Sequence, residues 1–179
     1  ALAAWHVSNE LGCHNVHDYS DEAAAAFRVW LAERYGDVGT LNEAWSTTFW
    51  SQRYADFAEV LPPRATTSFA NPAQQLDFAR FSSDALKDYL IAERELLRRI
   101  TPDVPITTNF MIMGETKAMD YADWAHEVDF VSNDHYRHPG PQDLDELSFS
   151  ANLTSGVALG APWYLMEHSP SAVNWQHVN

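Results

Sequence analysis

Short β-rich runs alternate with longer helical patterns along this chain of 179 residues, and the alternation limits the possible folds more than any other feature. Strand-like runs are expected at about residues 2–9, 104–110, 128–134 and 161–166. Apolar residues recur at helical spacing in the segments between them. Strands that are each followed by a helix favour a parallel sheet, because the helix carries the chain back across one face of the sheet. The expected fold class is α/β.

Local end signals set the expected helix boundaries. Ser20 is a suitable N-cap for a helix that ends at Gly36. Thr40-Leu41-Asn42-Glu43 has the form of a capping box and predicts a short helix that begins there. The dipeptide Asn71-Pro72 predicts the start of a long helix that continues to about residue 101. Two further helices are expected at about residues 121–126 and 142–159.

Polar residues gather where the strand candidates end, at Asn9-Glu10, Asn109, Asn133-Asp134-His135-Tyr136 and Glu167-His168. Such clustering is typical of a (β/α)8 barrel, whose chemistry lies at the carboxyl ends of its parallel strands. A doubly wound sheet would favour a glycine-rich first turn, and the sequence has no G-x-G-x-x-G motif. A complete barrel takes about 250 residues. The chain opens directly in a strand-like run, so we expect residues 1–179 to be an internal piece of a single catalytic barrel domain, with no second domain.

Two hydrophobic, strand-like runs end abruptly on a glutamate, at Glu10 and at Glu167. A carboxylate at the end of a buried strand is held rigidly and is partly desolvated, which suits acid/base or nucleophilic work. One such glutamate is more often a solvated loop residue. Two of them at one face of a barrel predict the paired carboxylates of glycoside hydrolysis, about 5 to 5.5 Å apart in a retaining enzyme.

Charge and composition exclude several classes of partner. The formal net charge is −14, which argues against nucleic acid or an anionic membrane surface, because both attract clustered Lys and Arg. No apolar run approaches the roughly 20 residues that cross a bilayer. The single cysteine, Cys13, excludes an intramolecular disulfide and is compatible with a cytoplasmic location. Aromatic residues make up 13% of the chain; we expect most to fill the core and a few to stack on sugar rings.

Several separated motifs together resemble the family 42 glycoside hydrolases, which are β-galactosidases. The motifs are Asn9-Glu10, Arg34-Tyr35-Gly36, Leu41-Asn42-Glu43-Ala44-Trp45, Thr48-Phe49-Trp50-Ser51-Gln52, Thr107-Thr108-Asn109-Phe110, Ser132-Asn133-Asp134-His135-Tyr136, Leu165-Met166-Glu167 and Asn174-Trp175. The resemblance covers essentially the whole chain, and its specificity comes from the agreement of many motifs in one order.

The resemblance implies roles for particular residues. Glu10 takes the place of the acid/base at the end of the fourth barrel strand, and Glu167 that of the nucleophile at the end of the seventh. The chain would then span about strands four to seven. Asn9 would hydrogen-bond the sugar 2-hydroxyl, and the remaining pocket positions fall on Trp50, Tyr136 and Trp175. For the two tryptophans core packing is the alternative, and Asn109 could contact substrate or satisfy loop backbone.

We expect no metal and no cofactor. Many family members carry a cysteine cluster for zinc after the acid/base strand, but here the segment that begins at Cys13 has a single thiol. The expected function is a retaining β-galactosidase that releases terminal galactose from oligosaccharides, and the resemblance implies a homotrimeric parent. The alternatives are an α-L-arabinopyranosidase, a β-glucosidase or a catalytically silent carbohydrate-binding module. An isolated piece of a barrel is expected to be inactive, because it exposes strand edges and the barrel interior.

Overall fold

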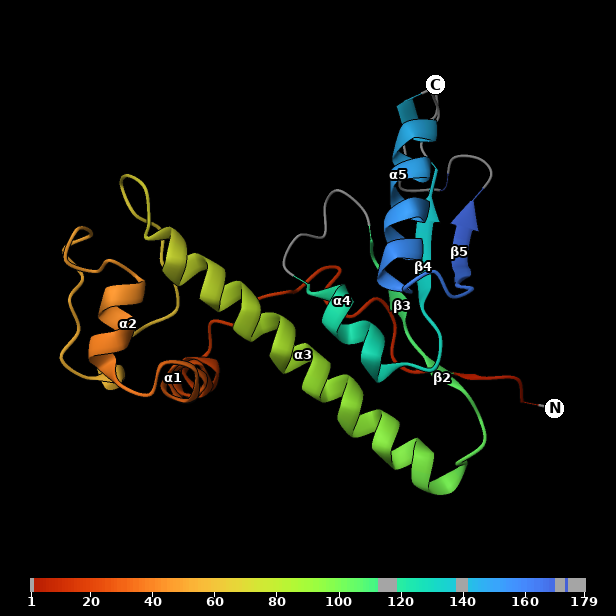
Figure 1. The fold of residues 1–179 in the computed structure, drawn as a ribbon, viewed down its shortest axis with the longest axis horizontal. Helices are drawn as coiled ribbons and strands as arrows, with labels where there is room; N and C mark the ends of the chain where they lie inside the picture. The colour runs from red at the N-terminus through yellow and green to blue at the C-terminus, as the bar shows by residue number, and fades with distance from the viewer. Residues whose placement is uncertain (1, 113–118, 138–141, 170–172, 174–179) are drawn as a thin grey trace. The chain divides into compact units, whose positions relative to one another are not determined.

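The computed structural model describes residues 2–112, 119–137, 142–169 and 173. It divides into two compact units (Figure 1). The strand unit consists of residues 1–14 and 85–179, and the helical unit consists of residues 15–84. The long helix α3 contributes residues to both units, and each unit is described by itself.

The strand unit contains short parallel strands, β1 Trp5–His6, β2 Ile106–Thr107, β3 Asn109–Phe110, β4 Ser132–Tyr136 and β5 Tyr164–Ser169. β1 pairs with β2, and β4 lies between β3 and β5 in a second sheet. Only Thr108 separates β2 from β3, so these two strands continue one another along the chain. The strands therefore lie side by side in the same order as in the sequence. The parallel arrangement confirms the α/β fold class.

Two strands extend further toward their carboxyl ends than expected. β4 begins at Ser132 and continues to Tyr136, and β5 continues through Glu167 to Ser169. His135, Tyr136, Glu167 and His168, which were expected after the strands, therefore lie within them. Hydrophobicity could not predict this, because the neighbouring backbone continues the ladder past the last apolar side chain. The expected run at 104–110 is divided into β2 and β3, since β1 pairs with its first half and β4 with its second.

The helices are α1 Asp21–Tyr35, α2 Val38–Ala44, α3 Pro72–Ile100, α4 Tyr121–Trp124 and α5 Gln142–Val157, with short 3₁₀ turns at Phe57–Glu59 and Ala125–Glu127. The Ser20 hydroxyl accepts from the Ala23 N–H, and Gly36 ends α1 with a φ of 77°, which glycine adopts without strain. Among the described residues, none of these helices is long and apolar enough to cross a membrane.

The predicted capping box at Thr40 is wrong. α2 begins at Val38, and the Asp37 carboxylate caps it by accepting from the Thr40 N–H at 3.0 Å. Asp37 directly follows the glycine that ends α1, so its extended backbone can serve as the N-cap as soon as the chain turns. The start of α3 at Asn71-Pro72 is confirmed, since Asn71 Oδ1 accepts from the Ala73 N–H at 3.0 Å.

Asp77 holds the helical unit together from within an aromatic core. The core contains Phe27, Leu31, Leu41, Trp45, Val60, Phe78 and Phe81. Asp77 is 2% exposed, and its Oδ2 accepts from the Tyr35 hydroxyl at 2.5 Å and from Trp45 Nε1 at 2.8 Å. Arg80 donates to the other carboxylate oxygen at 3.0 Å. One buried carboxylate therefore satisfies polar groups from α1, from α3 and from Trp45, which directly follows α2.

The strand unit has its own core under β2 and β3. Phe110 stacks on Tyr121 with ring centroids 4.6 Å apart, and Trp124 meets both rings edge-on. Leu90 of α3 packs in the same cluster and is fully buried. α5 packs along β4 (Figure 1). Asn133 of β4 bonds to Ser150 of α5, so α5 covers the face of β4 opposite to that of Asp134 and Tyr136. A rigid core therefore supports the carboxyl end of the short sheet.

Asp77→Ala is expected to lower the free energy of unfolding by about 3 kcal/mol, because the buried Trp45 Nε1–H and the partly buried Tyr35 hydroxyl lose their acceptor. Asp56→Ala is the matched control: Asp56 is exposed and accepts one backbone N–H, so it should cost about 1 kcal/mol. Urea unfolding followed by tryptophan fluorescence measures both. Equal losses in the two variants would contradict the central role of Asp77.

Candidate active site

A β-bulge in β5 determines which way Glu167 points. Asn133 pairs with Leu165, but Asp134 pairs with Glu167, so Met166 is an extra residue in the ladder. Side chains alternate between the two faces of a strand, and without the bulge Met166 would stand beside Asp134. The bulge therefore brings Glu167 to the face that also carries Asp134 and Tyr136.

Glu10 reaches the same place through a strained turn after β1. Ser8 and Glu10 have φ values of 57° and 47°, in the left-handed region that non-glycine residues rarely adopt. The Glu10 carbonyl accepts from the Cys13 N–H at 2.9 Å and closes the turn. Such a conformation costs on the order of 1 kcal/mol or more and persists only where the surroundings impose it. Here the surroundings include a buried amide.

That amide is the side chain of Asn109, which is 2% exposed. Its oxygen accepts from the Glu10 backbone N–H at 2.7 Å and lies 2.9 Å from His6 Nε2. Its nitrogen donates to Asp134 Oδ2 at 2.6 Å. The same nitrogen lies 3.2 Å from Glu167 Oε1 and 3.2 Å from Asn9 Oδ1. One side chain thus connects β1, β3, β4 and β5.

Three carboxyl groups meet around this amide. One oxygen from each of Glu10, Asp134 and Glu167 lies within 4.8 Å of the others. Burial, reinforced by the negative charges of Glu167 and then Glu10, raises the pKa of Asp134 to about 7. The Tyr136 hydroxyl donates to Glu167 Oε2, and this hydrogen bond together with burial raises the pKa of Tyr136. Tyr136 therefore stays a protonated donor to Glu167 at neutral pH.

The structure brings four of the six expected site residues together in the strand unit, namely Asn9, Glu10, Tyr136 and Glu167. Trp50 lies in the helical unit, partly buried and edge-on to Phe49 at 5.1 Å. Trp175 lies outside the described residues.

Sequence reasoning missed Asp134 as a member of the site. Its signal was the period of two in a strand, which places Asp134 and Tyr136 on one face once β4 is known to include both. Of the two roles considered for Asn109, the contact with loop backbone is present at Glu10, and the contact with substrate stays a prediction. Its bond to Asp134 had no separate signal in the sequence.

The residues after Glu10 do not fit a structural zinc site. Glu10, Cys13 and His14 offer ligand atoms within 4.8 Å of one another, but a closed zinc site takes four ligands, mostly Cys and His. The next two candidate donors have other partners. His17 Nδ1 is 2.7 Å from the Ser82 hydroxyl, and Asp18 accepts from the Ser20 N–H. We derive no chemistry from a metal here.

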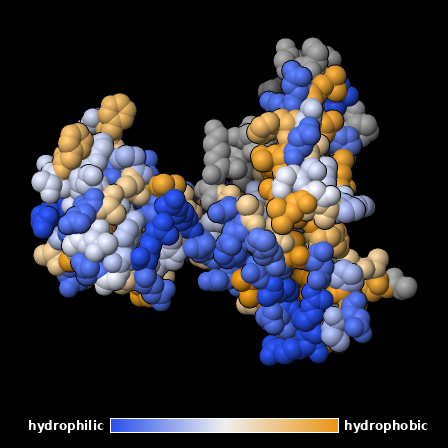
Figure 2. Space-filling model, in the orientation of Figure 1, coloured by the Kyte–Doolittle hydropathy of each residue, from blue (hydrophilic) through white to orange (hydrophobic). Residues whose placement is uncertain are grey.

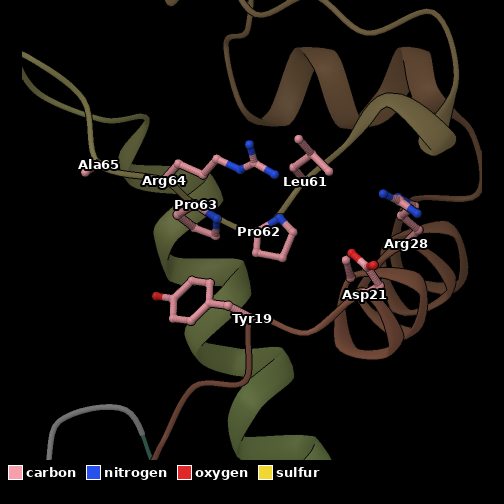
Figure 3. Close-up of a pocket in the computed structure, with 9 residues that line it drawn as sticks. Tyr19, Asp21, Arg28, Leu61, Pro62, Pro63, Arg64 and Ala65 are labelled. Atoms are coloured by element: carbon pink, nitrogen blue, oxygen red, sulfur yellow. The ribbon is translucent and has the colours of Figure 1, made fainter.

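The helical unit has a surface pocket of about 530 Å³ beside α1 (Figure 3). Tyr19 and Pro63 lie opposite Asp21 and Arg28 in this view, and the lining is completed by Ala24, Leu61, Pro62, Arg64 and Ala65. Asp21 is the only carboxylate in the lining. The pocket therefore lacks the pair of acids that hydrolysis by two carboxylates needs.

In the strand unit, by contrast, two glutamates approach each other, one of them held by a tyrosine hydroxyl and both by one amide. Such an arrangement can deliver a proton from one carboxyl and a nucleophilic oxygen from the other. Paired carboxyl groups of this kind are what glycoside hydrolysis by two carboxylates requires.

Comparison with known proteins gives the family. The glycoside hydrolase family 42 profile, described as beta-galactosidase, matches residues 1–179. Beta-galactosidase BbgII of Bifidobacterium bifidum is 53% identical over 99% of this chain and 26% of its own length. A beta-galactosidase of an Arthrobacter species is 56% identical over 100% of this chain and 26% of its own length. The chain therefore belongs to glycoside hydrolase family 42.

Solved structures agree with this assignment. The beta-galactosidase from the Antarctic haloarchaeon Halorubrum lacusprofundi matches with a TM-score of 0.87 and 38% identity, over 97% of this chain and 28% of that chain. This chain thus spans about a quarter of the length of the curated relatives it matches.

Asp134 should make stability depend on pH. Its pKa is about 7 in the folded protein and about 3.9 in an unfolded chain, so between these values the folded state binds the extra proton. The free energy of unfolding therefore falls as the pH rises from about 4 to about 7. Asp134→Asn removes this titration. Relative to wild type, the variant is expected to gain stability between about pH 5 and pH 8, measured by urea unfolding.

Asp129→Asn is the control for this titration. Burial opposes ionisation of Asp129, but hydrogen bonds from Arg98 and from the Ile106 N–H lower its pKa overall. Its stabilising charge is lost only as the pH falls through that lowered value, so the difference between Asp129→Asn and wild type should be constant from pH 5 to pH 8. A constant difference for Asp134→Asn as well would refute the raised pKa.

Proposed function

We propose that this chain is part of a retaining β-galactosidase that releases terminal β-D-galactose by double displacement. The observation that carries the proposal is the approach of the Glu10 and Glu167 carboxylate oxygens to within 4.8 Å of each other, in a chain of family 42. Retaining enzymes hold their carboxyl groups about 5 to 5.5 Å apart, whereas inverting enzymes leave about 6.5 to 9.5 Å for a water molecule. The separation favours retention.

In the proposed first step Glu167 attacks the anomeric carbon while Glu10 protonates the departing oxygen. Tyr136 donates to Glu167 Oε2, which holds the carboxylate and leaves Oε1 as the attacking atom. In the second step Glu10 takes a proton from water, and the water displaces Glu167 from the sugar. Asn9 is exposed beside the pair, and we assign it the sugar 2-hydroxyl.

We further propose that the strands are the fourth to seventh of a single (β/α)8 barrel domain that includes both units. The spatial order of the strands follows the sequence, as it does around a barrel. Within the described residues β1 pairs only with β2, and β5 only with β4. Large apolar side chains are exposed on α5 and β5, namely Leu144, Phe149, Leu153, Tyr164 and Leu165 (Figure 2). Further barrel elements would cover them, and without those elements we expect no activity.

The proposed substrate is a galactose-containing oligosaccharide, because the relatives are beta-galactosidases. We propose Trp50 and Trp175 as walls of the sugar pocket. The resemblance is the basis for proposing a homotrimeric parent, and the single cysteine is the basis for proposing a cytoplasmic location. An α-L-arabinopyranosidase, a β-glucosidase and a silent binding module are the alternatives that the experiments below separate.

Glu10→Ala in the full-length enzyme should lower kcat for lactose by about 10²- to 10⁴-fold, because the galactosidic bond loses its proton donor. A substrate with a very good leaving group, such as dinitrophenyl β-galactoside, needs little protonation and should form the glycosyl-enzyme nearly normally. Added azide should then restore turnover and give the β-galactosyl azide. Glu95→Gln, an exposed glutamate of the same unit, is the control and should leave kcat unchanged. Equal losses for lactose and for the activated substrate would argue against the acid/base role.

A 2-fluoro-galactoside with a good leaving group should trap the enzyme covalently at Glu167, because the fluorine slows hydrolysis of the intermediate more than its formation. Peptide mass spectrometry should find one adduct on the peptide that contains Glu167, and none in Glu167→Gln. Faster labelling by the fluoro-glucoside would indicate a β-glucosidase. Nitrophenyl galactoside and arabinopyranoside compared as substrates distinguish the remaining enzymatic alternative, and no hydrolysis of any of them would leave a binding module.

A further inference from the structure

Asp134 has no part in the two-glutamate mechanism, although its carboxylate bonds directly to the Asn109 amide. Its side chain is fully buried, on the same face of β4 as Tyr136. Oδ2 accepts from Asn109 Nδ2 at 2.6 Å, the shortest bond that this amide makes. Oδ1 is buried and makes no hydrogen bond within the described part of the chain. A buried carboxyl is expensive, so its place beside the catalytic pair calls for a reason.

The orientation of the Asn109 amide supplies that reason. An asparagine amide has an accepting oxygen at one end and a donating nitrogen at the other, and a half turn exchanges them. In the observed orientation the oxygen accepts from the Glu10 N–H, and the nitrogen faces Asp134. After a half turn, an NH₂ group would face the Glu10 N–H and an oxygen would lie about as close to Asp134 Oδ2 as the nitrogen does now. The turned NH₂ group would repel the Glu10 N–H. The turned oxygen would repel Asp134 Oδ2 when that atom is an acceptor.

We propose that Asp134 is a positioning residue, which fixes the Asn109 amide and through it places both Glu10 and Glu167. The inference rests on the proposed function, because it assigns those glutamates to the reaction. Without the acceptor at Asp134, the amide nitrogen loses its shortest hydrogen bond, and the amide can shift away from Glu10. The Glu10 backbone, which has a φ of 47°, then loses the bond that holds it, and Glu167 loses a contact on Oε1.

The role requires an acceptor oxygen facing Asn109, which the ionised Asp134 carboxylate offers and which the protonated carboxyl offers when its proton lies on Oδ1. The titratable groups that interact with it are Glu10, Tyr121, Tyr136 and Glu167. A protonated carboxyl keeps its carbonyl oxygen as an acceptor for Asn109, and its hydroxyl can donate to a neighbouring carboxylate. An asparagine at position 134 would likewise keep one acceptor and add one donor. Alanine and asparagine at position 134 are both neutral, but only asparagine keeps the hydrogen-bond acceptor that the proposal requires.

The test compares Asp134→Ala, Asp134→Asn and Ser132→Ala in the full-length enzyme. Asp134→Ala should lower kcat by about 100-fold with KM nearly unchanged, since small displacements of reacting groups cost about this much. Asp134→Asn should restore kcat to within about tenfold of wild type, because the acceptor is kept. Ser132 is buried on the same strand and face, and within the described ranges its side chain bonds to the Thr107 side chain and the Thr108 carbonyl alone. Ser132→Ala should lower stability without lowering kcat.

Neutron diffraction on the unliganded variants answers the question without turnover, because it distinguishes ND₂ from oxygen. In Asp134→Ala the Asn109 amide oxygen should lie beyond hydrogen-bond distance of the Glu10 nitrogen. In Asp134→Asn it should be in place. An unchanged amide in Asp134→Ala, or an equal fall in kcat for both Asp134 variants, overturns the inference. A wild-type enzyme that hydrolyses no galactoside overturns the proposed function instead, and the diffraction result still decides the role of Asp134.

Discussion

The hydrogen bonds of one buried amide, that of Asn109, fix the geometry on which the site depends. β1 and β5 do not pair with each other, so no backbone ladder relates Glu10 to Glu167. Asn109 lies in β3. Its amide oxygen accepts from the Glu10 N–H, and its amide nitrogen faces Glu167 Oε1. A buried amide keeps its partners because losing one leaves an unsatisfied polar group away from water. The separation of the two glutamates is therefore set by a side chain from a third strand.

A single extra residue completes this geometry from the other side. The parallel ladder would direct Met166 and not Glu167 toward Asp134, and the bulge reverses that assignment for the rest of β5. The same shift places His168 beside His135 on the face toward α5, where His168 Nδ1 meets the His135 carbonyl. The bulge in β5 thus lies on one side of the Asn109 amide, and the strained turn at Glu10 lies on the other. Local irregularities of this kind are often retained at functional sites because the chemistry requires the side-chain direction that they produce.

The sequence predicted the elements of this fold better than the relations between them. Ser20 and Asn71 carry cap chemistry that acts within one turn of helix, so their helix starts were predictable. Thr40 was misleading because Asp37, three residues earlier, competes for the same role. The two glutamates could be predicted from their motifs, whereas Asp134 could not. Its significance depends on a ladder partner 33 residues later and on a bulge, and neither leaves a periodic trace in the sequence.

The third carboxyl also limits where this site can be stable. The proposed reaction needs one proton on the pair of glutamates, and Asp134 adds no charge as long as it keeps its own. Above about pH 7 Asp134 ionises, and a third negative charge then lies within 4.8 Å of the other two. The free energy of unfolding has by then already fallen, between about pH 4 and about pH 7, and above that range the third charge opposes the formation of a negative nucleophile. A carboxyl retained at this cost is better explained by the orientation it imposes on Asn109 than by any contribution of its charge to folding.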